Sequence, residues 1–94
     1  MSSDSNDTAA GSPRLSLYQY DACPYCALVR MAIRELGLDI EIRDVLRHPR
    51  FRRELIAGGG SSQVPCLRLD YPDGRTRWMY ESLDIIDYLR RRFG

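Results

Sequence analysis

Apolar and polar positions at the start of the chain predict a strand followed by a helix. Residues 15–20 form a short run rich in Leu and Tyr, which is typical of a strand that ends at a turn. After this turn, apolar residues recur at helical spacing, and arginine and glutamate occupy the opposite side. Pro24 suits the first helical turn, and Gly37 suits a position just past the last one. The apolar stripe of this helix comprises Leu28, Val29, Ala32, Ile33 and Leu36.

The rest of the pattern predicts a second strand, a short helix, a hairpin and a final helix. Residues 40–45 alternate between apolar and charged side chains, as a strand does, and residues 49–57 form a short helix. We expect three glycines and two serines, residues 58–62, to follow as a flexible loop. An Asp-Gly pair between residues 66–71 and 76–80 indicates a hairpin. The final helix, residues 82–93, begins with Ser82 as N-cap and buries Leu83, Ile85, Ile86 and Leu89.

The predicted order of elements is therefore β-α-β-α-β-β-α, an α/β fold. The first strand, helix and strand should form a parallel pair with a right-handed crossover. The last two strands add an antiparallel hairpin, which gives a mixed four-stranded sheet with flanking helices. Residues 1–13 offer almost nothing to bury and are expected to form a disordered tail. Residues 14–94 remain as one domain of about 80 residues, enough for a single small core.

Charge and hydropathy exclude several classes of function. The formal net charge is +1, from 14 basic and 13 acidic residues, which argues against a nucleic-acid binder that relies on bulk electrostatics. All 14 of these basic residues are arginines, and none is a lysine. We interpret them as scattered along the chain, and their excess over lysine as a compositional bias. No apolar run approaches the roughly 18 residues of a membrane span, and the N-terminus lacks a secretory signal pattern. We therefore expect a cytoplasmic protein with no membrane or nucleic-acid partner.

Two of the three cysteines form a C-x-x-C motif, Cys23-Pro24-Tyr25-Cys26, where the first strand meets the first helix. The free N–H groups and the positive dipole end of a helix N-terminus favour the thiolate form of Cys23, and the thiolate is the reactive species. Cys26 follows one helical turn later, close enough to attack a mixed disulfide formed on Cys23. This spacing predicts Cys23 as nucleophile and Cys26 as the more buried resolving cysteine.

Purely structural roles for the cysteine pair fit the sequence less well. A structural zinc site needs four ligands, and only Cys66 and His48 remain as further candidates, neither of them in a paired spacing. No metal site is therefore expected. Two incidental cysteines on a core helix are the other structural alternative, which the strand-to-helix position of the pair disfavours. Cys66 is interpreted as an inert strand residue, with a regulatory or third redox thiol as the alternative.

The motifs together resemble a known family. The tetrapeptide Cys23-Pro24-Tyr25-Cys26, the Val64-Pro65 pair before the third strand and the order of elements resemble the dithiol glutaredoxins of the thioredoxin fold. The stretch from Tyr80 to Leu89 is similar to the matching stretch in the N-terminal domain of glutathione S-transferases. The resemblance covers residues 15–93 and implies glutathione as co-substrate.

The resemblance also implies roles for individual residues. Pro65 would be a cis-proline beside the active site, and the backbone of Val64 would pair with the cysteinyl part of glutathione like an added strand. Glu81 and Ser82 resemble the residues that hold the γ-glutamyl end, a role that also suits a helix N-terminus. For Ser82 a simple N-cap is the alternative. Two further positions match: Asp84 falls where glutaredoxins carry an acid for the glutathione amine, and Tyr25 would flank the bound tripeptide.

The sequence departs from the glutaredoxin pattern at several positions. Many glutaredoxins carry a lysine shortly before the motif and Thr or Ser directly before it, whereas this chain has Tyr20 and Ala22. The lost cation would weaken thiolate stabilisation and binding of the glycine-end carboxylate unless Arg50 or Arg53 substitutes. The usual Gly-Gly-Cys-Asp stretch is replaced by residues 80–82, Tyr-Glu-Ser.

These features lead to one main functional expectation. The chain should be a monomeric, glutathione-dependent thiol–disulfide oxidoreductase that reduces protein disulfides and glutathione mixed disulfides of protein partners. One alternative is a non-catalytic glutathione-binding module or a transferase N-terminal-domain-like protein. Another is an iron–sulfur carrier that uses Cys23 and glutathione as ligands across a dimer, which the Pro-Tyr interior of the motif disfavours.

Overall fold

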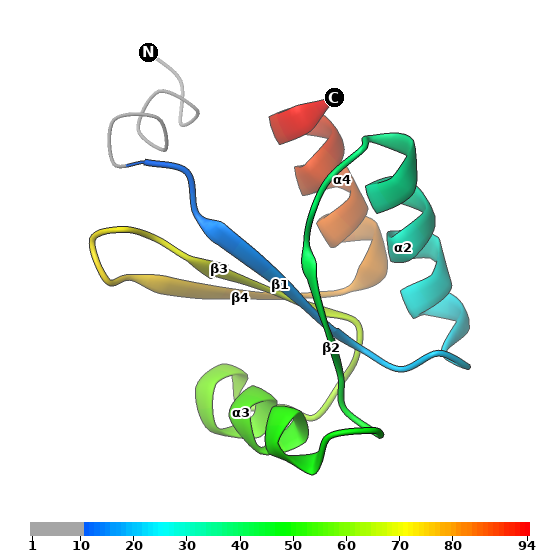
Figure 1. Ribbon diagram of the computed structural model, residues 1–94, viewed down its shortest axis with the longest axis vertical. Helices are drawn as coiled ribbons and strands as arrows, with labels where there is room; N and C mark the ends of the chain where they lie inside the picture. Colours follow the sequence, from blue (N-terminus) through cyan, green and yellow to red (C-terminus); the bar gives the residue numbers. More distant parts are fainter. Residues whose placement is uncertain (1–10) are drawn as a thin grey trace.

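A computed structural model describes residues 11–94, so the expected tail, residues 1–13, lies almost wholly outside the described residues. In the described part, four strands and three helices follow the predicted order, β-α-β-α-β-β-α (Figure 1). The elements are β1 (Arg14–Gln19), α2 (Pro24–Glu35), β2 (Glu41–Asp44), α3 (Pro49–Gly59), β3 (Cys66–Asp70), β4 (Thr76–Tyr80) and α4 (Ser82–Phe93). Over residues 11–94, no helix is both long enough and apolar enough to cross a bilayer.

The four strands form one mixed sheet in the order β2-β1-β3-β4. Strands β1 and β2 run parallel, with Leu17 opposite Ile42, because α2 carries the chain back to the starting end of β1. Strand β3 pairs antiparallel with both β1 and β4. The β3–β4 hairpin closes with a hydrogen bond of 3.0 Å from the Gly74 N–H to the Tyr71 carbonyl. The mixed four-stranded sheet with flanking helices that the sequence predicts is confirmed.

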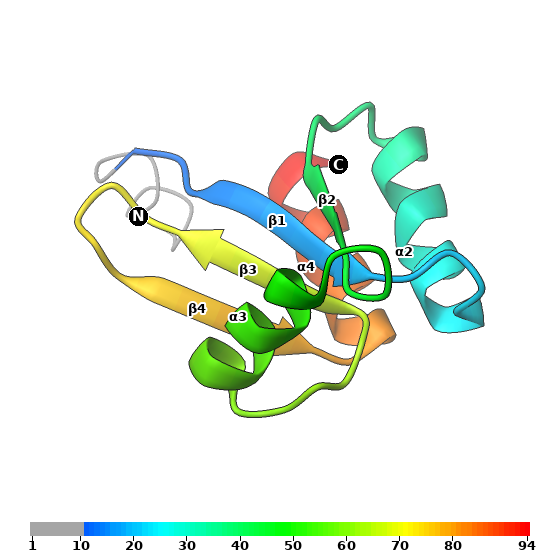
Figure 2. The same cartoon turned by 60° about the horizontal axis from the view of Figure 1, so that its bottom comes forward.

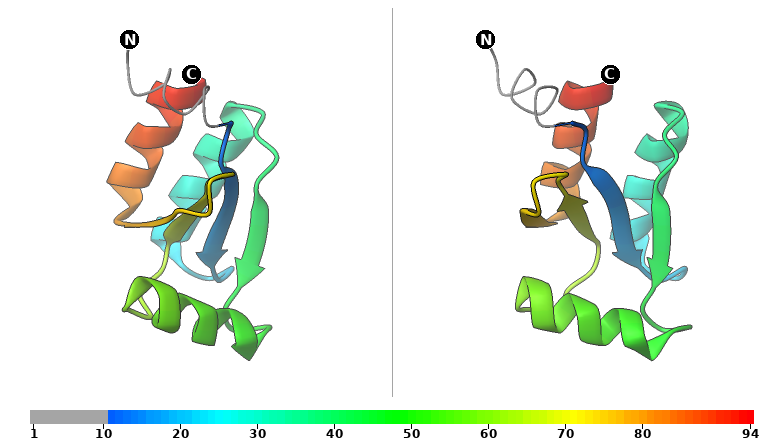
Figure 3. Two further views of the ribbon diagram at one scale, coloured as in Figure 1. Left: turned by 90° about the vertical axis from the view of Figure 1, so that its left-hand side faces the viewer. Right: turned by 60° about the vertical axis from the view of Figure 1, so that its left-hand side comes forward.

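Helices cover both faces of the sheet. Helices α2 and α4 lie side by side on one face, and α3 lies apart from them on the other (Figures 2 and 3). Successive side chains of a strand point to opposite faces, so β1 sends Leu15 and Leu17 towards α2 and α4 and Tyr18 towards α3. The core under α2 and α4 is mainly aliphatic and includes Val29, Ile85 and the β3 leucines.

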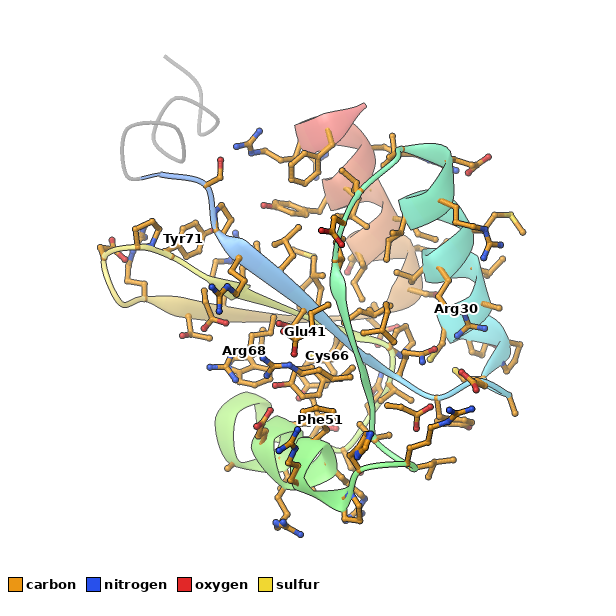
Figure 4. All side chains as sticks on the ribbon, viewed as in Figure 1. Arg30, Glu41, Phe51, Cys66, Arg68 and Tyr71 are labelled. Carbon is orange, nitrogen blue, oxygen red and sulfur yellow. The ribbon has the colours of Figure 1, made fainter. Side chains whose placement is uncertain are left out.

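The layer beneath α3 combines aromatic rings with a partly buried polar network. The Tyr18 hydroxyl donates to Glu54 Oε1 at 2.8 Å and accepts hydrogen bonds from Arg43 Nη1 at 2.8 Å and Arg68 Nη1 at 3.2 Å. The Arg68 guanidinium also lies over the Trp78 ring, 5.0 Å from its centroid. Figure 4 shows Arg68 between α3 and the sheet. This network therefore joins β1, β2, β3 and β4 to α3.

The expectation of a flexible glycine loop at residues 58–62 is wrong for its first two members. Gly58 and Gly59 belong to α3, and only Gly60, at φ 87°, caps it in a left-handed conformation. A Cβ atom on Gly58 would lie 2.1 Å from Trp78 Cζ2, and one on Gly59 would lie 2.1 Å from the Tyr80 hydroxyl. These glycines therefore let the last turn of α3 approach the sheet closely.

Three expectations about α2 and α4 are also wrong. Leu28 on α2 is 44% exposed and Leu83 on α4 is 74% exposed, so neither belongs to the core stripe. Helical spacing identifies a face, and both leucines lie at the edge of that face. Ser82 is not the N-cap: Glu81 takes that position and Ser82 is the first residue of α4.

Candidate functional site

The Cys23 thiol lies at the N-terminus of α2, as the sequence predicts. Cys23 is the N-cap residue, in an extended conformation, and its Sγ atom accepts a hydrogen bond of 3.2 Å from the Cys26 N–H. Its own N–H donates to the Tyr20 carbonyl at 3.2 Å, which closes the turn after β1. Both cysteines are buried, and Cys26 more deeply, at 0% exposure against 4% for Cys23. The Cys23 sulfur thus accepts a backbone N–H bond at the positive end of the helix dipole.

Arg30 supplies a cation near the cysteine pair. Its guanidinium bonds to Gln19 Oε1 and donates from Nη2 to the Asp21 carbonyl at 3.3 Å, so it ties the β1–α2 turn to α2. The same charge favours the thiolate of Cys26 and opposes the rise of its pKa. Figure 4 shows Arg30 projecting from α2. Neither Arg50 nor Arg53, the arginines expected to replace the missing lysine, lines the pocket described below.

The other two thiols hold their protons at neutral pH. Burial, followed by the hydrogen bond with Cys23, raises the pKa of Cys26 to about 12. Burial likewise raises the pKa of Cys66 to about 12. Cys66 directly follows Pro65 but belongs to the cluster beneath α3, packed with Tyr18. These surroundings favour Cys66 as an inert strand residue and leave Cys23 as the candidate nucleophile.

A pocket of about 560 Å³ opens between the N-termini of α2 and α4 and the segment before β3. It brings together all six residues expected to bind glutathione: Tyr25, Val64, Pro65, Glu81, Ser82 and Asp84. The Val64-Pro65 peptide bond is cis, as the resemblance implies. Both helices begin at the same end of the sheet (Figure 3), so their free N–H groups converge on this region. Neither cysteine lines the pocket; Tyr25, two residues after Cys23, is the nearest lining residue along the chain.

The start of α4 can hold both ends of an α-amino acid. The first N–H groups of α4 have no partner within the helix, so they suit a carboxylate, and Ser82 is buried beside them. The carboxylates of Glu81 and Asp84 at the same rim suit an ammonium group. Glu81 has a φ of 74°, a conformation unfavourable for a side chain that bears a Cβ. Backbone strain of this kind concentrates at binding sites, where the surrounding fold maintains it.

The pocket also contains three residues that sequence reasoning missed: Leu28, Gln63 and Leu83. Gln63 donates from Nε2 to Glu81 Oε1 at 3.2 Å and so links the segment before β3 to the start of α4. Its position directly before Val64-Pro65 is a signal that could have identified it. The helical spacing predicts Leu28 and Leu83 in core stripes, and their exposure places them at the pocket rim instead.

No group of three or more His, Cys, Asp and Glu side chains is arranged to hold a metal ion within residues 11–94. The donors that do converge at the pocket are the carboxylates of Glu81 and Asp84. The described arrangement is one of two thiols at the start of α2 and two carboxylates at the rim of the neighbouring pocket.

A C-x-x-C motif at a strand–helix junction, a cis-proline before an antiparallel strand and this sheet order define a thioredoxin-fold domain. The chain belongs to the glutathione S-transferase N-terminal domain family, whose profile matches residues 17–94.

A curated relative is similar to this chain over part of its own length. Glutaredoxin 2 from Escherichia coli strain K12 is 32% identical over 80 residues, which cover 85% of this chain and 34% of the relative. The chain thus spans about a third of the length of the curated relatives it matches.

Solved structures likewise match most of this chain but less than half of their own length. Maleylacetoacetate isomerase from Anaeromyxobacter dehalogenans, solved with glutathione in its active site, superposes with a TM-score of 0.67 at 32% identity. The match covers 87% of this chain and 38% of that one. Glutathione transferase Omega 2S from Trametes versicolor, at 18% identity and a TM-score of 0.68 over 88% of this chain and 38% of that one, shares the fold.

Proposed function

We propose that this domain is a cytoplasmic, glutathione-dependent thiol–disulfide oxidoreductase of the dithiol glutaredoxin type. The observation that carries the proposal is the Cys23 thiol at the N-terminus of α2, next to a pocket formed by all six expected glutathione-binding residues. The similarity to glutaredoxin 2 and to an isomerase solved with glutathione supports a glutathione-related activity.

The reaction needs only thiols and disulfides. The Cys23 thiolate attacks the glutathione sulfur of a protein–glutathione mixed disulfide; the protein leaves as a thiolate, and Cys23 becomes glutathionylated. A second glutathione thiolate then attacks this glutathione sulfur, which releases oxidised glutathione and regenerates the Cys23 thiolate. With a protein disulfide as substrate, Cys23 attacks one sulfur and releases the other as a thiolate. Cys26 then attacks Cys23 Sγ, the Cys23–protein bond breaks, and the Cys26 proton passes to the departing protein thiolate. Two glutathione molecules reduce the resulting Cys23–Cys26 disulfide and leave as oxidised glutathione.

Glutathione takes one orientation in this proposal. Its γ-glutamyl carboxylate lies at the N–H groups of α4 near Ser82, and its ammonium group lies by Glu81 and Asp84. Its cysteinyl backbone pairs with Val64 in the manner of an added strand, which directs the sulfur towards Cys23. Tyr25 flanks the peptide.

The test is turnover of a small mixed disulfide, hydroxyethyl glutathione disulfide, with glutathione and a coupled reductase. We expect Cys23→Ser to abolish turnover and Cys26→Ser to retain it, because this monothiol route uses only Cys23. Equal rates for the wild type and Cys23→Ser would refute the proposal. Cys66→Ala serves as control and should leave the rate unchanged, since that thiol is buried beneath α3.

Measuring glutathione binding separately from turnover distinguishes an enzyme from a module that only binds glutathione. Glu81→Gln and Asp84→Asn should each weaken glutathione binding, measured by calorimetry, because each removes a carboxylate from the ammonium site. If the wild type binds glutathione normally but turns over no disulfide, a non-catalytic glutathione-binding module is the better assignment.

A further inference from the structure

The segment from β2 into α3 carries a concentration of positive charge. Residues 47–53 contain four arginines and a histidine and no carboxylate, so the interpretation of the arginines as scattered is wrong here. We call Arg47, Arg50, Arg52 and Arg53 the arginine patch. All four side chains are exposed, and Leu46 beside them is 68% exposed.

Much of this charge is uncompensated within the described chain. Arg47 pairs with Asp21 at 3.0 Å, but Arg50, Arg52 and Arg53 have no carboxylate within 4.0 Å among residues 11–94. The one acid of α3, Glu54, is already bound by Arg43 at 2.9 Å. Three of these arginines also lie in the first turns of α3, where the helix dipole is positive and cations destabilise the helix. Helix stability therefore does not explain the patch.

The patch adjoins the turn between β1 and α2 that carries Cys23, and it contributes no residue to the glutathione pocket. The ion pair between Arg47 and Asp21 joins it to the turn that carries Cys23, two residues further on. A cleft of about 430 Å³ runs between this turn and the start of α3, lined by Asp21, Arg47, His48 and Phe51 among others. The cleft and the glutathione pocket share no lining residue. A protein joined to Cys23 or to glutathione at Cys23 would have the patch within reach.

We infer that the arginine patch is a docking surface for acidic protein substrates, those with carboxylates close to the disulfide or glutathionylated cysteine. This inference rests on the proposed thiol–disulfide activity and adds the class of partner. Because the net charge of the whole chain is only +1, attraction of an acidic partner depends on local patches such as this one and not on the overall charge. Arginine is also enriched in protein interfaces.

The test uses two synthetic 12-residue peptides, each glutathionylated on one central cysteine, flanked by glutamates in one and by serines in the other. At low salt we expect kcat/KM to be about tenfold higher for the acidic peptide, with the preference falling as ionic strength rises. The patch variant Arg50→Gln/Arg52→Gln/Arg53→Gln should lose most of this preference. The matched control, Arg14→Gln/Arg34→Gln/Arg77→Gln, removes three exposed arginines elsewhere and should keep it.

Turnover of hydroxyethyl glutathione disulfide distinguishes failure of this inference from failure of the proposed function. The patch variant should retain it, because the patch lies outside the glutathione pocket. If the wild type turns over this small substrate but shows no acidic preference, or if both triple variants lose the preference equally, the docking inference is overturned. Binding of a fluorescent single-stranded DNA 20-mer that only the patch variant loses, without any peptide preference, would assign the patch to nucleic acid and also overturn it.

Discussion

Replacing Gly58 by alanine adds one methyl group where α3 comes closest to the sheet. The new Cβ would lie 2.1 Å from Trp78 Cζ2, whereas carbon atoms in contact lie about 3.5 Å apart or more. The indole ring is not free to retreat, because Tyr18 packs on it at a centroid distance of 5.5 Å and Arg68 lies over it at 5.0 Å. The substitution must therefore displace α3 or the ring with its neighbours.

Two effects of opposite sign decide the outcome. Overpacking of this kind costs about 1–3 kcal/mol, with this short distance at the upper end. Alanine is better than glycine within a helix by about 1 kcal/mol, which offsets part of the loss. We expect Gly58→Ala to lower the free energy of unfolding by about 1–2 kcal/mol, or the Tm by roughly 5–15 °C in a domain of this size.

The assay is urea unfolding followed by fluorescence of Trp78, the only tryptophan of the chain and a direct partner of Gly58. Ala57→Gly is the matched control, since Ala57 is an exposed neighbour on the same helix and reports helix propensity alone. It should lower the free energy of unfolding by about 1 kcal/mol or less without shifting the native emission spectrum. A Gly58→Ala variant as stable as the wild type, or more stable, would refute the close-packing argument.

Four further predictions follow, two on the thiols and two on local features at Ser16 and Glu81. At pH 7 iodoacetamide should modify only Cys23, because burial raises the pKa of Cys26 and Cys66 to about 12; mass spectrometry showing modified Cys66 would contradict this. For the same reason the free energy of unfolding should fall as pH rises from 9 towards 12, since unfolded thiols ionise near 9.0 while the folded ones stay protonated. Ser16→Ala should be neutral or stabilising by about 1 kcal/mol in urea unfolding, because the buried Ser16 hydroxyl has no hydrogen-bond partner among residues 11–94; a clear loss would reveal one. Glu81→Gly should stabilise the fold by about 1 kcal/mol through relief of its positive φ while weakening glutathione binding in calorimetry, and a destabilised variant would show that the conformation is not strained.

The sequence predicts the order of elements and the site motif well because both depend on local signals. Periodicity identifies α2 and α4, and the position of Cys23 before Pro24 is enough to place the thiol at a helix N-terminus. What it misses depends on contacts between distant elements. Gly58 has the sequence signature of a loop residue until Trp78 is known to lie against it.

The same limit applies to the site. All six expected pocket residues come together, because a family motif preserves their relative placement. The sequence suggests Arg50 or Arg53 as the cation, and the structure has Arg30 at the cysteine pair instead, since the side chain reaches back along α2 to the turn before it. Side-chain reach of this kind is invisible in spacing alone. Leu83 is wrongly predicted in the core for a similar reason: the spacing gives its face of α4 but does not show that the first turn of α4 lines a pocket.

The position of Arg30 has a consequence for how this site can change over evolution. In the proposed function, the nucleophile, the resolving cysteine and a cation whose charge acts on Cys26 all lie within eight consecutive residues, Cys23 to Arg30, on one helix and its cap. In a chain that takes its cation from a distant loop, every insertion in that loop would alter the chemistry of the thiols. Here the loops and α3 are free to diversify, acquiring new recognition surfaces, while the charge environment of the two sulfur atoms is inherited intact with a single short segment.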